Sequence, residues 1–457
     1  MKFRLVACVM LGLLAAAACM PSPAAGPGPT PQAASASQSQ TFPAPLADNQ
    51  KVTISFTNYN VAQAGIGKEA TEQLVNEFMQ QHPNITVQFR PVLSPDITTK
   101  TQAEVVAGDP PDLAQLIMAD VEFVANDLGA KPLDTIVPPD EFQSYVQGEY
   151  PLHPRGLKLA ELNGRLYGIP YVFSTPVLFY NADIFRQAGL DPNAPPTTWK
   201  QVKSYGEQIK ERTGKLGIDI ACLGAGAADW CWQALVLSNG GRVLSEDRST
   251  LMFGEAGAIG AASMWQDLVQ SGVHPASITT DFVGDGFGAG KTAMYLQTSA
   301  VQSALLTASA GKFEIRTAMM PGFDDKPTRP TNSGSALFIL ANDPAKQRAA
   351  WELMKYLTSE HGYTIIQSKI GYLPLRPGIV DDPKYLKDWV AQNPLVLPNL
   401  KQLDDLEPWV GFPGPNYASI RTTMMKAVEA VVMGGADAAS TMQDAQQRAS
   451  QMMPSHS

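Results

Sequence analysis

Near residue 50 the chain alternates apolar and polar side chains, and a helical pattern interrupts the alternation. Residues 52–56 read Val-Thr-Ile-Ser-Phe and residues 85–89 read Ile-Thr-Val-Gln-Phe, so both segments predict strands. Between them, residues 68–81 place apolar side chains at helical spacing, and Pro83 ends the predicted helix. A β-α-β unit of this kind predicts a parallel sheet with a right-handed crossover.

Strand and helix patterns alternate along the rest of the chain. Short apolar runs predict strands within 110–118 and at 176–180, 292–296 and 336–340. Helical spacing predicts helices at 98–108, 199–212, 256–271, 345–358, 420–433 and 438–452. Because about 400 residues exceed what one hydrophobic core usually supports, we predict an α/β fold with two doubly wound lobes.

The first 48 residues have a different character. Lys2 and Arg4 precede an apolar run at 5–18 that is short for a bilayer span and ends in small residues, which predicts a signal peptide over 1–18. The run ends in three alanines before Cys19 and resembles the lipobox of bacterial lipoproteins, in which the cysteine is lipidated; ordinary cleavage after an A-x-A site is the alternative. Residues 19–48 are rich in Pro, Ala, Ser and Gln, which predicts a lipid-anchored flexible linker.

Charge and composition exclude several classes of partner. The net charge is −9, and loss of Lys2 and Arg4 with the signal peptide would make it −11. An acidic chain without basic runs argues against nucleic acid and against an anionic membrane surface, so we expect membrane contact only through the lipid anchor. His82, His153 and His274 each precede a proline, and no histidines pair at ligand spacing. We therefore expect no metal and no cofactor.

Of the four cysteines, Cys8 belongs to the predicted signal peptide and Cys19 is the predicted lipidation site, which leaves two. Cys222 and Cys231 flank a Gly/Ala-rich stretch, and an even remainder in an oxidising compartment predicts a disulfide between them. Two buried free thiols are the alternative. The spacing fits no common zinc pattern.

The stretch GDGFGAGKT at 284–292 comes close to a phosphate-binding P-loop. That motif needs Gly, four residues, Gly, Lys and then Ser or Thr, but Asp285 stands five places before Gly290 where the first glycine belongs. We expect instead a turn at Gly290, buried packing side chains at Phe287 and Met294, and a surface charge at Lys291.

Several short segments, taken in order, resemble one known family, the extracellular solute-binding proteins of bacterial ABC importers in the branch that binds sugars and glycerol phosphates. The resemblance covers residues 51–453. The segments are GDPPDL (108–113), NGRLYGIP (163–170), STPVLFYN (174–181), AGLDP (188–192), PPTTW (195–199), FGAGKTAM (287–294), ALFIL (336–340) and QSKIGYLPLRP (367–377).

The resemblance implies two lobes that close on a solute held between them, and delivery of that solute to a membrane permease by a monomer without catalysis. It places the first lobe at about 50–172 plus 292–342 and the second at about 178–290 plus 346–457. The implied crossings between the lobes lie near 173–176, 289–292 and 341–344.

The glycerol-3-phosphate-binding proteins are the most similar branch, and their ligand contacts can be transferred residue by residue. The resemblance implies a ligand-contacting serine at Ser174, a stacking tryptophan at Trp199 and a hydroxyl at Thr298. It also implies a backbone contact at Gly334, a phenol at Tyr372 and a phosphate-binding arginine at Arg421. Two positions depart from that branch: its tyrosine has no clear counterpart, Asp96 being nearest, and its glutamate falls on Met118. A neutral sugar therefore stays open as the ligand, beside glycerol-3-phosphate and a glycerophosphodiester.

Further candidates come from the residues themselves. Trp230 and Trp232 flank Cys231 in the Gly/Ala-rich stretch, and aromatic side chains on a loop often line a cleft that binds sugars. Asn58 and Tyr59 follow the first strand, where ligands of parallel sheets gather. Ser335 and Asn416, neighbours of Gly334 and Arg421, complete the predicted ligand-binding set.

The role of Arg421 has an alternative. Its position near a predicted helix start after a Gly/Pro/aromatic stretch suits an anion site, because backbone N–H groups and a guanidinium converge there. A structural ion pair with an acidic side chain would also explain it. For the whole chain, a secreted glycoside hydrolase would need two carboxylates facing one cleft, and the sequence shows no such motif. A structural or adhesive surface lipoprotein is the third possibility.

Overall fold

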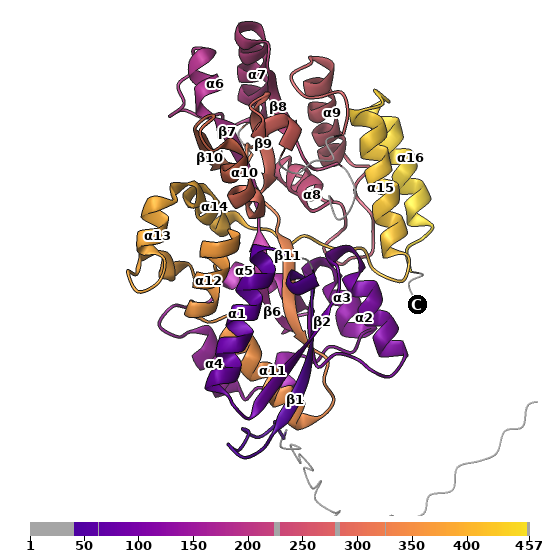
Figure 1. The fold of residues 1–457 in the computed structure, drawn as a ribbon. Helices are drawn as coiled ribbons and strands as arrows, with labels where there is room; N and C mark the ends of the chain where they lie inside the picture. The colour runs from indigo at the N-terminus through magenta and orange to yellow at the C-terminus, as the bar shows by residue number, and fades with distance from the viewer. Residues whose placement is uncertain (1–40, 63, 224–228, 279–283, 325, 455–457) are drawn as a thin grey trace, which may run out of the picture. The chain divides into compact units, whose positions relative to one another are not determined.

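The computed structural model describes residues 41–62, 64–223, 229–278, 284–324 and 326–454 (Figure 1). The predicted signal peptide, Cys19 and the predicted linker up to residue 40 lie outside the described residues. The end of the predicted linker packs on the fold, because Leu46 contacts a hydrophobic core and Asn84 donates a hydrogen bond to the carbonyl of Ala47. The folded part therefore begins a few residues before the predicted boundary at residue 48.

The first sheet has five strands in the order β2-β1-β3-β11-β6. Their bounds are β1 Val52–Asn58, β2 Ile85–Pro91, β3 Leu113–Ile117, β6 Gly168–Ser174 and β11 Ser333–Ile339. β1 runs parallel to β2 and β3, and β11 runs antiparallel to β3 and β6. The predicted β-α-β unit is confirmed, because α1 (Ile66–Gln81) joins β1 to the parallel strand β2.

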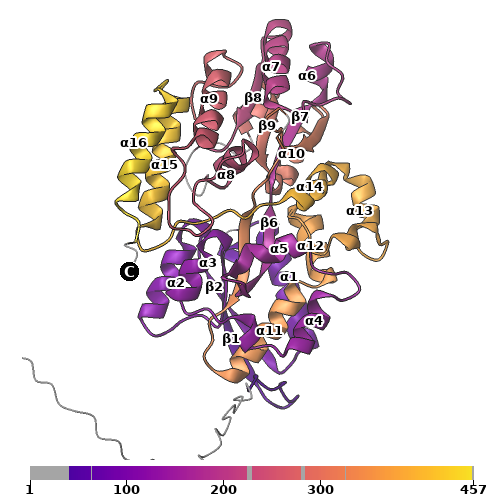
Figure 2. The same ribbon diagram turned by 180° about the vertical axis from the view of Figure 1, so that it is seen from behind.

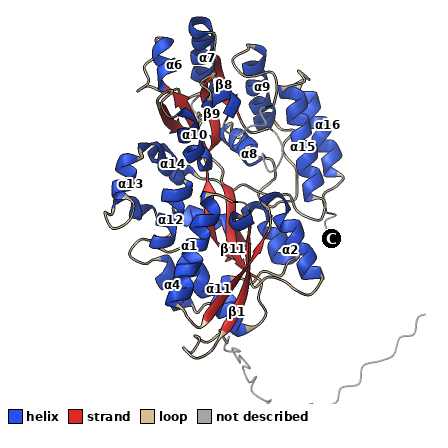
Figure 3. Ribbon diagram, viewed as in Figure 1, coloured by secondary structure: helices blue, strands red, loops and turns tan. Residues whose placement is uncertain are grey.

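Helices flank this sheet and build what we call the first lobe (Figure 3). They are α2 Ile97–Val106, α3 Val121–Asn126, α4 Pro139–Val146, α5 Pro154–Leu157, α11 Pro344–Leu357, α12 Glu360–Ile370 and α13 Lys387–Gln392. A two-stranded hairpin of β4 (Glu161–Leu162) and β5 (Arg165–Leu166) adds to it. α11 packs against β1, and both α11 and α12 pack against α1, so apolar side chains far apart in sequence form one core.

The second sheet has four strands in the order β10-β7-β9-β8, and it builds the second lobe. The strands are β7 Pro176–Asn181, β8 Leu216–Ile220, β9 Thr292–Thr298 and β10 Ile315–Met319. The helices of this lobe are α6 Ala182–Gln187, α7 Trp199–Thr213, α8 Asp229–Ser238, α9 Ala256–Gln270, α10 Gln302–Ser309, α15 Tyr417–Val432 and α16 Ala438–Ser450. α15 and α16 pack on each other and on α9 (Figure 2). α14 (Leu397–Lys401) contacts β7 and β10. The α/β fold with two lobes is as predicted.

The division of the chain between the lobes differs from the prediction in two places. The predicted first-lobe segment 292–342 begins with β9 and β10, but these strands pair with β7 and β8 in the second sheet. The predicted second-lobe segment 346–457 begins with α11 and α12, whose side chains share a core with β1. Leu406 still belongs to a core of the first lobe, and Trp409 to the core of the second. The chain therefore crosses between β6 and β7, between β10 and β11, and again between Leu406 and Trp409, rather than near 289–292 and 341–344.

The stretch that resembles a P-loop forms a turn before β9. Gly290 adopts a φ of +69°, a region that glycine enters without a steric penalty. Phe287 and Met294 are buried, and Lys291 is exposed. Phe287 stacks on Tyr295. The four expected roles are confirmed, although the strand that follows stays in the second sheet.

A carboxylate on α4 ties that helix to α11. Glu141 accepts hydrogen bonds from both terminal nitrogens of Arg348, at 2.6 and 3.0 Å, from Trp351 Nε1 at 2.8 Å and from Lys355 Nζ at 3.0 Å. Burial raises the pKa of the Glu141 carboxyl, but these donors outweigh burial and lower the pKa to about 2. Because the pKa is lower in the folded state, the ionised carboxylate stabilises the fold above the ordinary pKa of 4.5, and this stabilisation disappears as the pH falls toward 2.

We predict that Glu141→Gln lowers the free energy of unfolding at pH 7 by about 1–2 kcal/mol, a value reduced from that of a buried charged hydrogen bond because the group is partly in solvent. The difference from the wild type should shrink between about pH 4.5 and pH 2. Urea unfolding at a series of pH values measures it. Glu149→Gln, on an exposed side chain of the same lobe, is the control and should change little. A deficit that does not vary with pH would contradict the prediction.

Candidate functional site

A group of hydroxyls lies at the carboxyl end of β1. The hydroxyl of Tyr59, the residue after β1, lies 3.0 Å from Ser335 Oγ on β11. Gln115 on β3 donates to the same Ser335 Oγ at 2.9 Å, and the phenol of Tyr372 is close enough to that of Tyr59 to interact with it electrostatically. Burial raises the pKa of the Tyr59 phenol well above its ordinary value, so it is neutral and can donate a hydrogen bond. Three predicted residues, Tyr59, Ser335 and Tyr372, are therefore together.

A second group lies where the chain leaves the first sheet for the second. Ser174 Oγ at the end of β6 and Thr298 Oγ1 at the end of β9 are 2.5 Å apart. Gly334 pairs with Phe173 beside them and has a φ of +119°. A Cβ at Gly334 would lie 2.1 Å from the carbonyl oxygen of Val172, so only glycine fits this close approach of two strands. Ser174, Thr298 and Gly334 are thus brought together as predicted from the resemblance.

Arg421 lies near two buried carboxylates. It belongs to α15, is half-buried, and interacts electrostatically with Asp120 at the end of a short 3₁₀ turn (Met118–Asp120) and with Asp229 at the start of α8. Burial raises the pKa of both carboxyls, and Arg421 acts in the opposite direction. Among the described residues, Arg421 donates no hydrogen bond and forms no ion pair within 4 Å. The alternative of a direct structural ion pair is therefore absent from this part of the chain.

The two carboxylates differ in how they are satisfied. Asp120 accepts a hydrogen bond from Thr98 Oγ1 at 2.8 Å. Asp229 Oδ2 accepts from Trp409 Nε1 at 3.0 Å and from Gln233 Nε2 at 3.2 Å. The other oxygen, Asp229 Oδ1, is buried and has no hydrogen-bond partner among the described residues. Because an unpartnered buried acceptor is costly, this oxygen marks a place where a donor from a solute would be satisfied.

Sequence reasoning did not select either carboxylate as a site residue. Asp229 stood out only as one of many acidic residues, and its position directly before Trp230 was the signal that could have selected it. Asp120 follows the predicted strand within 110–118, so the rule that selected Asn58 and Tyr59 would also have selected Asp120.

The three candidate tryptophans, Trp199, Trp230 and Trp232, are all buried in the core of the second lobe. The stretch around Cys231 is helical from Asp229 onward rather than a loop, and α8 is buried on nearly all sides. Trp232 on this helix is fully buried in the core of the second lobe. Trp230 lies in the first turn of α8, and its carbonyl accepts a hydrogen bond from Thr331. Trp199 packs in the same core, against Phe323.

The remaining predicted residues have structural contacts. Asn58 is buried, and its Oδ1 accepts a hydrogen bond from the backbone of Val61 at 3.1 Å. Asn416 is exposed and donates to the carbonyl of Met452 at 3.0 Å. The structure thus does not bring Trp199, Trp232 or Asn416 together with the hydroxyl groups or with the carboxylates.

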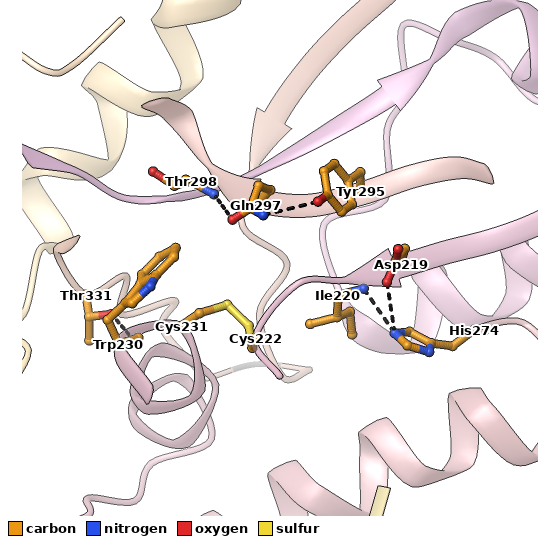
Figure 4. The surroundings of a disulfide bond; sticks show 10 residues. All are labelled: Asp219, Ile220, Cys222, Trp230, Cys231, His274, Tyr295, Gln297, Thr298 and Thr331. Atoms are coloured by element: carbon orange, nitrogen blue, oxygen red, sulfur yellow. Dashed lines mark hydrogen bonds and ion pairs between the residues drawn. A yellow bond between two sulfur atoms is a disulfide. The ribbon is translucent and has the colours of Figure 1, made fainter. Parts of the chain in front are cut away.

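Cys222 and Cys231 are joined by a disulfide whose Cα atoms are 5.2 Å apart (Figure 4). Both residues are buried. Among the described residues, no cluster of three or more His, Cys, Asp and Glu side chains could hold a metal ion. In the same part of the chain, no helix is both long enough and apolar enough to cross a bilayer.

Comparison with known proteins identifies the family. Residues 64–363, well over half of the chain, match the family of bacterial extracellular solute-binding proteins. The chain belongs to this family. Its members bind small solutes outside the cell or in the periplasm and work with ABC permeases.

Curated relatives of this solute-binding protein include sn-glycerol-3-phosphate-binding proteins. UgpB of Pectobacterium atrosepticum is 24% identical over 324 residues, which are 68% of this chain and 70% of that protein. UgpB of Escherichia coli K12 is 22% identical over 350 residues, which are 74% and 77% of the two chains.

Solved structures share the fold. The cyclic α-maltosyl-1,6-maltose binding protein of Arthrobacter globiformis superposes with a TM-score of 0.74 at 22% identity and covers 88% of this chain and 98% of its own. UgpB of Mycobacterium tuberculosis, solved with glycerophosphocholine, has a TM-score of 0.72 at 21% identity and covers the same shares. These likenesses show a fold shared by proteins with different solutes.

Proposed function

We propose that this solute-binding protein captures a glycerol-phosphate-type solute between its lobes, a glycerophosphodiester in preference to glycerol-3-phosphate, and delivers it to an ABC permease. The observation that carries the proposal is Arg421, a half-buried guanidinium without a protein partner among the described residues, near the carboxylates of Asp120 and Asp229. A free guanidinium can bind two oxygens of one phosphate, which gives both affinity and orientation.

Charge decides between the two phosphate ligands. A phosphate monoester carries about −1.5 to −2 charges at pH 7, whereas a diester carries one. Arg421 supplies one positive charge, and both carboxylates nearby would repel a second negative charge on the solute. A diester matches Arg421 one to one. A cationic or hydroxyl-bearing second group on the diester would then neutralise or hydrogen-bond the carboxylates.

The hydroxyl groups suit the glycerol part of such a solute. Tyr59, Ser174, Thr298 and Ser335 offer donors and acceptors that hold a polyol by several hydrogen bonds. Trp230 is 7% exposed, so its indole would meet carbon-bound hydrogens of the solute only through the small part that stays accessible. UgpB of Mycobacterium tuberculosis, which shares the fold, was solved with glycerophosphocholine, and this supports the same class of solute here.

A neutral oligosaccharide is the second candidate. The specific observation in its favour is the pair of buried carboxylates, because Asp120 and Asp229 would accept hydrogen bonds from sugar hydroxyls while Arg421 balances their charge. The similar structure from Arthrobacter globiformis binds a cyclic maltosyl-maltose.

Export and anchoring complete the proposal. The N-terminal pattern supports a signal peptide over 1–18, lipid attachment at Cys19 and a linker that lets the lobes reach a permease in the same membrane. Solute binding to both lobes would favour the closed arrangement. A shift from 1:99 to 99:1 needs about 5.5 kcal/mol of differential binding.

We predict that Arg421→Ala weakens glycerophosphocholine binding by about 10- to 150-fold, because a hydrogen-bonded charge contributes about 1.5–3 kcal/mol. Isothermal titration calorimetry on the mature protein measures the affinity. Arg448→Ala, which removes an exposed arginine from α16 in the same lobe, is the matched control and should bind as the wild type does. Unchanged affinity in Arg421→Ala would remove the phosphate from the proposal.

We predict that Asp120→Asn changes the preference between the two phosphates. Loss of one negative charge should strengthen glycerol-3-phosphate binding by about 3- to 10-fold and weaken glycerophosphocholine binding, since the choline cation loses an attractive charge. Titrations of both ligands at low salt measure the ratio. Asp127→Asn, on an exposed residue nearby in the chain, is the control. Two affinities that move in the same direction would contradict the charge argument.

A further inference from the structure

The disulfide joins the second sheet to the first turn of a helix that supplies site residues. Cys222 follows β8, and the backbone N–H of Ala221 still bonds to Leu296 of β9, so the sheet fixes the position of this cysteine. Cys231 lies in the first turn of α8, directly after Asp229 and Trp230 (Figure 4). β9 continues to Thr298, one of the site hydroxyls.

The start of α8 contacts both later crossing segments between the lobes. Thr331, which lies between β10 and β11, donates to the carbonyl of Trp230. Trp409, which lies between the first-lobe core and α15, donates from Nε1 to Asp229 at 3.0 Å. Gln233, one turn further along α8, exchanges two hydrogen bonds with the backbone of Val410, at 2.9 and 3.2 Å.

These polar contacts attach the start of α8 to segments that must bend or shift when the lobes open and close. The disulfide attaches the same turn to the sheet, which keeps its shape in a hinge motion. Apolar packing also holds α8 in the core of the second lobe, because nearly all of its side chains are buried. The disulfide adds a covalent attachment of the first turn, which carries a buried carboxylate, to the end of β8.

We infer that the Cys222–Cys231 disulfide is a positioning element of the solute site: it holds Asp229 and Trp230 in place relative to Thr298 and Arg421. The inference rests on the proposed function, because it concerns the site that function uses. The disulfide acts through Asp229 and Trp230 and does not touch the solute.

The test removes the disulfide from the mature protein and measures glycerophosphocholine binding by calorimetry. Cys222→Ala/Cys231→Ala should bind at least tenfold more weakly than the wild type at a temperature where both are folded. Val202→Ala, a cavity in α7 within the same core, is the stability control; it should lower the melting temperature without changing affinity. A loss of affinity in both variants alike would show that general loosening is the cause and would overturn the inference.

A double-mutant cycle separates positioning from stability. Asp229→Asn should weaken solute binding when the disulfide is present. When the disulfide is absent, the same substitution should change the logarithm of the affinity by less than half as much. If the effects of Asp229→Asn and disulfide removal simply multiply, the disulfide does not act through Asp229 and the inference is wrong.

Hydrogen exchange without solute gives a second, independent readout. In the cysteine double variant, backbone amides of α8 should exchange faster while those of α9 keep their protection. If the double variant does not fold, the wild type reduced with a phosphine gives the same comparison. Unchanged α8 protection would overturn the inference. A wild type that binds none of the glycerol phosphates or maltodextrins overturns the proposed function instead, while the exchange result still decides whether the disulfide positions α8.

Discussion

The constraint on which the proposed site depends is the guanidinium of Arg421, which has no hydrogen-bond partner among the described residues and lies near two buried carboxylates. Burial makes the charged forms of Asp120 and Asp229 costly, and Arg421 offsets this cost without a direct ion pair among the described residues. Among the described residues, Asp229 Oδ1 and the donors of Arg421 have no hydrogen-bond partner. Under the proposed function, a bound solute would supply these partners, so the arrangement would favour the occupied site over the empty one.

This charge group draws on distant parts of the chain, and the crossing segments determine its geometry. Asp120 belongs to the first lobe, whereas Asp229 and Arg421 belong to the second. Trp409 bonds to Asp229 through its indole and to Asn332 through its backbone at 2.8 Å, so two crossing segments contact each other directly under the site. A change in the angle between the lobes would change the distance from Asp120 to the other two charges, and under the proposed function this would couple solute binding to closure.

Local pattern predicted part of the elements and the pairing of β1 with β2, but it missed β6, β8 and β10 and gave the wrong lobe for β9. The alternation at 292–296 correctly indicates a strand, yet nothing in it indicates whether β9 pairs with β8 or joins the first sheet, because pairing depends on long-range contacts. The hydroxyl residues were predictable from motifs and from their place at strand ends, as with Ser174, Thr298 and Tyr59. Asp120 and Asp229 belong to no periodic pattern. Trp230 and Trp232 are indistinguishable in sequence, and in the structure both are buried in the core of the second lobe.

Under the proposed function, one ion pair between the lobes illustrates why closure would still need a solute. Arg248, with a left-handed φ of +62°, donates to Glu122 on α3 at 2.8 Å and to the carbonyl of Gly411 at 2.9 Å. Both charged side chains are about one quarter exposed. Pairs that water reaches contribute up to about 1 kcal/mol, well short of the roughly 5.5 kcal/mol that a complete shift toward closure requires. The pair can guide the lobes into register, but under the proposed function most of the energy of closure would come from the charges and hydroxyls that a solute satisfies.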